Sequence, residues 1–148
     1  MAERKAIAEW TGTLTDGEGR MVLGSGTYDG RFSFATRMGD EPGSNPEEFI
    51  GAALAGCYSM ALNASLEKRG TPAENVRTEA KVFLGKDDAG FKINRIDLSV
   101  QVRVDGVSED EFLQVAETVK KSCPISRALA ATDITLDARF GGAGLTGA

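Results

Sequence analysis

The stretch Asn45-Pro-Glu-Glu-Phe-Ile-Gly-Ala-Ala-Leu-Ala-Gly-Cys-Tyr-Ser-Met-Ala-Leu62 decides how this chain folds. Its first residues predict a helix start. Asn45 is a favourable cap, Pro46 suits the first helical position, and Glu48 follows the cap by three residues and can bond back to it. We expect the helix to run to about Arg69, where a glycine and a proline follow.

Residues 49–66 of this helix include no charged side chain, so the helix must be covered on nearly all sides. One small subunit can hardly supply that cover, and we therefore infer a homodimer whose partner contributes part of it. Small side chains around Cys57 would let another backbone approach: Gly51, Ala52, Ala53, Ala55 and Gly56. The stretch is long enough to be compared with a membrane span, but its glycines, serines and Asn63 favour a helix buried in protein.

Alternating polarity predicts strands on both sides of this helix. They are expected at residues 5–13, 20–27, 31–36, 76–84, 91–104 and 132–140. Two more helices should follow the second group of strands, one opened by a capping box at Ser108 and a short one after Cys123-Pro124. Hairpins rather than crossovers connect these strands, which predicts an α+β fold of antiparallel sheets packed around central helices.

A length of 148 residues with 41% hydrophobic residues fits one globular domain. We expect this domain at residues 1–140, followed by a disordered glycine-rich tail at 141–148. The N-terminus carries charge where a signal peptide would be apolar, so a cytoplasmic location is expected. A net charge of −5 argues against binding to nucleic acid or to an anionic membrane, since both require a cationic surface.

The chain contains two cysteines and no histidine. A Ser-His-Asp triad or a Cys-His dyad is therefore impossible, and neither a metal nor another cofactor is expected. P-loop, CxxC and EF-hand patterns are also missing from the sequence. If the protein is an enzyme, thiol chemistry is the leading candidate.

The surroundings of the two thiols differ. Cys57 lies inside the uncharged helix, which predicts a buried thiol, and a small hydrophobic role without chemistry is the alternative. Cys123 precedes a helix start, where unpaired N–H groups and the helix dipole favour a thiolate, and a plain capping role is its alternative. From the residues alone, Arg37 reads as a surface charge and Glu47 as a partner of the helix dipole.

Four segments together carry a family resemblance: Phe34-Ala-Thr-Arg37, residues 43–62, Ser122-Cys-Pro-Ile-Ser126 and Ile134-Thr-Leu-Asp137. They resemble the OsmC/Ohr family of osmotically inducible proteins and organic hydroperoxide resistance proteins. The likeness covers essentially the whole chain to Phe140. Within this family the chain resembles the osmotically inducible branch more, because that branch has a Thr-Arg pair shortly before the Asn-Pro-Glu-Glu segment.

The resemblance implies an OsmC-like fold, an intertwined homodimer with two active sites at its interface, and a thiol-dependent peroxidase. The implied substrates are organic hydroperoxides and hydrogen peroxide. Cys57 would be the peroxidatic cysteine and Cys123 the resolving cysteine, with Arg37 and Glu47 completing the site. An intramolecular Cys57–Cys123 disulfide would form, and an external dithiol would reduce it.

Two physical arguments bear on these roles. The helix dipole favours Cys123 as the more acidic thiol, whereas the resemblance assigns the attack to Cys57. A guanidinium from Arg37, held by a carboxylate, can reverse that order. Glu47 precedes Cys57 by ten residues, about 15 Å along one helix, so we expect the partner subunit to supply Arg37 and Glu47.

Two other classes of protein remain compatible with the sequence. A redox sensor or apolar-ligand-binding dimer would use the same thiols without turnover, so it would oxidise once and stop. A structural dimer with incidental cysteines would tolerate replacement of both cysteines by alanine in peroxide-stressed cells.

Overall fold

The computed structural model describes residues 1–141, so residues 142–148 of the predicted tail lie outside it. Gly141 is the last residue of the final strand, which makes the prediction of a disordered tail wrong for that residue. The chain divides into two compact units, Met1–Phe49 and a second unit from Ile50 onward, and we describe each by itself. The single domain expected at 1–140 stays a prediction.

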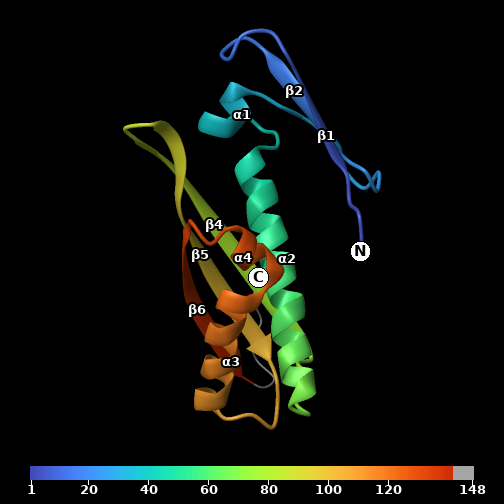
Figure 1. Ribbon diagram of the computed structural model, residues 1–148, viewed down its shortest axis with the longest axis vertical. Helices are drawn as coiled ribbons and strands as arrows, with labels where there is room; N and C mark the ends of the chain where they lie inside the picture. Colours follow the sequence, from blue (N-terminus) through green and yellow to red (C-terminus); the bar gives the residue numbers. More distant parts are fainter. Residues whose placement is uncertain (142–148) are drawn as a thin grey trace. The chain divides into compact units, whose positions relative to one another are not determined.

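The first unit begins with an antiparallel sheet in the order β1-β2-β3 (Figure 1). Its strands are β1 (Ala6–Thr11), β2 (Glu18–Leu23) and β3 (Asp29–Phe32). The rings of Trp10 and Phe32 meet at 5.5 Å between their centroids. Gly19 makes room for this pair, because a Cβ there would lie 2.3 Å from the Phe32 ring.

A short helix, α1 (Phe34–Met38), follows β3 directly, so the prediction of a strand through residue 36 was wrong. A capping box explains the difference. The Ser33 side chain accepts a hydrogen bond from the Thr36 N–H, and the Thr36 hydroxyl oxygen accepts one from the Ser33 N–H. These local bonds satisfy the backbone groups that a longer strand would have left to a neighbouring strand.

Side-chain bonds tie the loop after α1 to the sheet and prepare the next helix. The Thr36 hydroxyl donates to the Ser44 carbonyl at 2.9 Å, and the Ser44 hydroxyl donates to the Arg31 carbonyl at 2.9 Å. Asn45 Oδ1 then accepts the Glu48 N–H at 2.8 Å, which confirms the predicted cap. The long helix α2 (Pro46–Lys68) follows.

The elements of the second unit agree with the predicted order. After α2 come β4 (Asn75–Asp87), β5 (Gly90–Arg103), α3 (Glu109–Ser122), α4 (Pro124–Ala128) and β6 (Asp133–Gly141). The capping box at Ser108 is present, and Cys123 caps α4 as the sequence indicated. The α+β class is confirmed.

One connection in this unit differs from the prediction. Strands β4 and β5 form the expected antiparallel hairpin, but β6 pairs with β5 in parallel. Parallel neighbours need a crossover, and α3 with α4 supplies it. The sheet is therefore mixed, in the order β4-β5-β6, and the expectation of hairpins alone was wrong for its last strand.

The core of the second unit lies between one face of its sheet and two helices, and Figure 1 shows α3 running along the sheet. Strand β5 contributes alternate residues from Ile96 to Val102. Helix α3 contributes Phe112, Val115, Ala116 and Val119. Helix α2 contributes a stripe with a spacing of four: Leu54, Tyr58, Leu62 and Leu66.

The opposite face of α2 is exposed and apolar. It carries Ala52, Gly56, Met60 and Ala64, which are offset by two residues from the buried stripe and so point about 200° away from it. By length and composition alone α2 could cross a membrane, with a mean hydropathy of 1.4, but core helices of soluble proteins pass the same test. The face toward β5 and α3 is packed as in such a core helix.

Candidate active site

The two cysteines come together in the second unit although 66 positions separate them in sequence. Cys57 lies in the middle of α2 and Cys123 lies between the end of α3 and the start of α4. Cys57 packs against the buried cluster that includes Cys123, and the Cys123 thiol is near enough to raise the pKa of Cys57. Both cysteines are free thiols. The two cysteines that the family resemblance pairs are therefore neighbours, one on α2 and the other at the junction of α3 and α4.

The first turn of α4 offers one N–H donor to each sulfur. Its first residue, Pro124, has no N–H group. The backbone N–H of Ile125 is near enough to the Cys57 sulfur to lower its pKa, and that of Ser126 donates to Cys123 Sγ at 3.4 Å. Each of the two sulfurs therefore has a backbone N–H group of this turn beside it.

The burial of the two thiols differs from the expectation. We predicted a buried Cys57, but in this chain Cys57 is only partly buried, whereas Cys123 is 1% exposed. Cys57 projects from α2 between its buried stripe and its exposed face. The end of α3 and the start of α4 enclose Cys123, a packing that the sequence pattern did not indicate.

Burial nevertheless raises the pKa of the Cys57 thiol above its usual value. The N–H of Ile125 opposes this rise, and the neighbouring Cys123 thiol adds to it. Within one chain, then, Cys57 is a weaker acid than a free cysteine. An additional positive group near its sulfur would be needed to make it a ready nucleophile at neutral pH.

Ser126 belongs to one of the segments that carry the family resemblance, but its residue type alone predicted no role for it. Its hydroxyl oxygen lies 3.0 Å from Cys123 Sγ, and the residue is only 5% exposed. A serine three positions after a helix-capping cysteine was the available signal, because residues at the cap and at the third helical position meet.

Arg37 and Glu47 come together in the first unit. Arg37 Nη2 donates to Glu47 Oε1 at 2.6 Å, and Arg37 Nε lies 3.1 Å from Oε2. The carboxylate is largely buried, with 12% of its side chain exposed. This hydrogen-bonded carboxylate raises the pKa of Arg37 further, so the guanidinium stays charged and fixed in orientation.

Local structure explains this ion pair. Helix α1 carries Arg37 in its last turn, and Glu47 lies in the first turn of α2. The bonds of Thr36 and Ser44 hold the loop between them. The alternating pattern predicted a strand up to residue 36, so the helix that carries Arg37 was not expected from the sequence.

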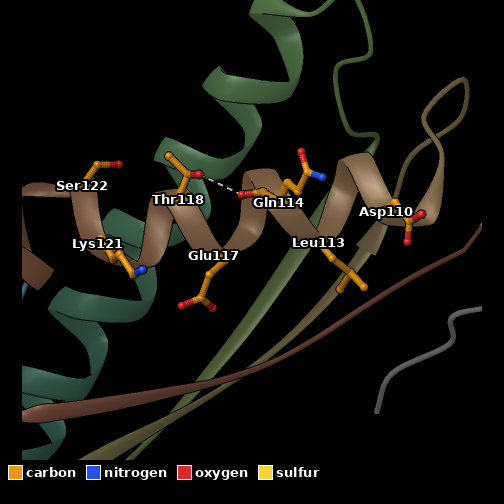
Figure 2. Close-up of a pocket in the computed structure, with 7 residues that line it drawn as sticks. All are labelled: Asp110, Leu113, Gln114, Glu117, Thr118, Lys121 and Ser122. Atoms are coloured by element: carbon orange, nitrogen blue, oxygen red, sulfur yellow. Dashed lines mark hydrogen bonds between the residues drawn. The ribbon is translucent and has the colours of Figure 1, made fainter.

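Two other kinds of site, a ligand pocket and a metal centre, are not supported by the described residues. Figure 2 shows an open hollow whose seven labelled residues all belong to α3, from Asp110 to Ser122. One face of one helix encloses little, so this hollow has no convergent groups to hold a ligand. Among residues 1–141, no three Cys, Asp or Glu side chains are grouped to hold a metal ion.

Comparison with known proteins agrees with this fold. The model of the family described as OsmC-like protein matches residues 39–138. A peroxiredoxin OsmC of Escherichia coli is 41% identical over 135 residues, which cover 90% of this chain and 94% of that protein. The chain belongs to the OsmC family.

More distant relatives extend the comparison. An organic hydroperoxide resistance protein of Xanthomonas axonopodis is 29% identical over 130 residues, covering 84% of this chain and 89% of that protein. The solved structure of an OsmC-like protein of Vibrio cholerae superimposes with a TM-score of 0.74 at 20% identity, covering 94% of this chain and all of that one. The likeness to this solved structure shows the fold alone.

Proposed function

We propose that this protein is a thiol-dependent peroxidase that reduces organic hydroperoxides, and also hydrogen peroxide, as part of antioxidant defence. The observation that carries the proposal is the proximity of Cys57 and Cys123 at the first turn of α4. The names of its relatives, a peroxiredoxin and an organic hydroperoxide resistance protein, support the same class of substrate. The cycle starts from two reduced thiols, which suits the reducing cytoplasm.

The reaction follows from the chemistry of the two sulfurs. The Cys57 thiolate attacks one oxygen of the O–O bond, the bond breaks, and the leaving alkoxide takes a proton to become an alcohol. Cys57 is then a sulfenic acid, and the Cys123 thiolate attacks its sulfur and expels hydroxide. The resulting disulfide is reduced by an external dithiol through a mixed disulfide.

In this proposal Arg37, held by Glu47, supplies the positive group that makes the Cys57 thiol a ready nucleophile. A guanidinium stabilises both the attacking thiolate and the negative charge that develops on the leaving oxygen. The two-pronged contact with Glu47 fixes its orientation. Because ten residues of helix separate Glu47 from Cys57, about 15 Å, the partner subunit contributes this ion pair.

The exposed face of α2 supports the homodimer that this arrangement requires. Met60 is 77% exposed although it lies in the middle of an uncharged helix. Strand β1 of the first unit also exposes apolar side chains, including Ile7 and Trp10. Surfaces of this kind are typical of subunit interfaces.

The test is consumption of cumene hydroperoxide with dithiothreitol as the reductant. The wild-type protein should consume many equivalents, and Cys57→Ser none. Without reductant, Cys123→Ser should react once and stop at a sulfenic acid that dimedone traps. If wild-type protein with free thiols consumed no peroxide, the peroxidase would be excluded in favour of a sensor or binding protein.

A further inference from the structure

Resting on the proposed peroxidase, we propose that Ser126 is a positioning residue whose hydroxyl donates to Cys123 Sγ and stabilises the thiolate released when the Cys57–Cys123 disulfide is reduced. The hydroxyl oxygen lies 3.0 Å from that sulfur. Ser126 is buried, with 5% of the residue exposed.

The direction of this bond follows from the state of the sulfur. In the neutral thiol either atom can donate. A thiolate has no proton, so only the hydroxyl can donate to it. The backbone N–H of Ser126 also points to this sulfur at 3.4 Å, so one residue gives the anion two donors. Water does not replace them, because Cys123 is 1% exposed.

The exposure of the two sulfurs decides which of them the reductant attacks. Within its own chain Cys57 is partly exposed and Cys123 is buried, so a thiolate of the dithiol attacks Cys57 Sγ. The disulfide bond breaks, and its electron pair leaves on Cys123 Sγ. The second thiol of the dithiol then attacks the mixed disulfide, releases Cys57 and leaves the dithiol oxidised. A better stabilised leaving thiolate speeds the first of these steps.

A purely structural role for Ser126 makes a different prediction. Ser126 is the third residue of α4, and Cys123 is its cap, so loss of the hydroxyl could simply loosen the helix. Replacement by alanine or glycine removes the same hydroxyl and keeps the N–H donor, but glycine destabilises a helix more than alanine. If the rate of disulfide reduction depends on the hydroxyl, the two variants will react at equal rates. If it depends on the stability of the helix, the glycine variant will differ from the alanine variant.

The experiment measures reduction of the preformed disulfide. Diamide oxidises Cys57 and Cys123 in each variant, and dithiothreitol reduces the bond while free thiols are counted over time. Ser126→Ala and Ser126→Gly should both react about tenfold more slowly than wild type, the effect of one hydrogen bond to a charged group. Ser126→Thr, which keeps the hydroxyl, should react at the wild-type rate.

The matched control is Ser108→Ala, which removes the cap of α3 and should leave the reduction rate unchanged. The proposal is overturned if Ser126→Ala and Ser126→Gly are reduced at the wild-type rate, if Ser126→Thr is as slow as they are, or if the rates follow stability. Because diamide makes the disulfide without peroxide, this result is independent of whether the protein turns over hydroperoxides.

Discussion

At the scale of single residues, Arg37 is held in a defined geometry by its ion pair with Glu47. Two of its nitrogens contact the carboxylate of Glu47, an arrangement that a planar guanidinium can make and an ammonium cannot. The carboxylate in turn is buried, so it has little freedom to follow a displaced partner. The pair therefore presents a positive group in one orientation.

Replacement of Arg37 by lysine should therefore lower kcat/KM for cumene hydroperoxide about 10- to 100-fold, although the charge is kept. Steady-state kinetics measure this change. Arg20→Lys is the control, because Arg20 also pairs with a carboxylate, that of Asp29, but at an exposed position of the sheet. Equal losses in the two variants would contradict a specific role for Arg37.

The pH dependence of the first step gives a second prediction at this scale. Burial raises the pKa of Cys57, and only the thiolate attacks, so the rate of peroxide reduction rises with pH through that pKa. A nearby guanidinium lowers the pKa of a thiol. Arg37→Met should therefore shift the pH–rate profile, measured by stopped flow, toward higher pH by about one pH unit or more. An unshifted profile would mean that Arg37 does not face the sulfur.

At the scale of elements, the sequence predicted those parts of the fold that local signals decide. The Asn45-Pro46 start of α2 and the capping box at Ser108 depend on a few adjacent residues, and both are present. The parallel pairing of β6 depends on where a crossover returns, which no local pattern of β6 records. Helix α1 was missed because alternation up to Phe34 outweighed the Ser33–Thr36 cap.

The candidate site was also predictable only in part. Sequence resemblance indicated Arg37, Glu47 and the two cysteines, and the structure brings each pair together. The greater burial of Cys123 and its bond to Ser126 could not be read from spacing. They depend on how the end of α3 meets the start of α4, a tertiary arrangement.

Helix α1 gives the prediction for this scale. Ser33→Ala removes its cap and should cost about 1 kcal/mol of unfolding free energy. Because α1 carries Arg37, the same change should lower peroxidase activity severalfold. Ser108→Ala should cost a similar free energy without loss of activity, as urea unfolding and steady-state assays together can show. Full activity in Ser33→Ala would mean that α1 does not position Arg37.

At the scale of the whole molecule, one face of α2 is packed in the core of its own chain and the opposite face is exposed. Its buried stripe packs against β5 and α3, and the opposite stripe is exposed. Met60→Glu would place a charge in the proposed dimer interface and should convert the dimer to monomers in sedimentation experiments. Leu113→Glu, on the exposed face of α3, should remain a dimer. Monomeric wild-type protein would contradict the proposed interface.

Mixed dimers can test which subunit contributes the Arg37–Glu47 ion pair to each active site. Such a dimer joins two different variants and is purified through two different affinity tags. Dimers of Cys57→Ser alone and of Arg37→Met alone should be nearly inactive. In the mixed dimer, the chain that retains Cys57 faces a partner that retains Arg37. If the partner supplies the guanidinium, one of the two symmetric sites works, and activity returns to about half of wild type.

A second mixed dimer, of Cys57→Ser with Cys123→Ser, provides the control for this experiment. Cys57 and Cys123 meet within one chain, so neither subunit of that dimer holds a complete pair. It should stay inactive in multiple turnovers at low reductant concentration. No recovery in the first mixed dimer would place Arg37 in the same subunit as its Cys57, whereas recovery in the second would mean that the disulfide joins two subunits.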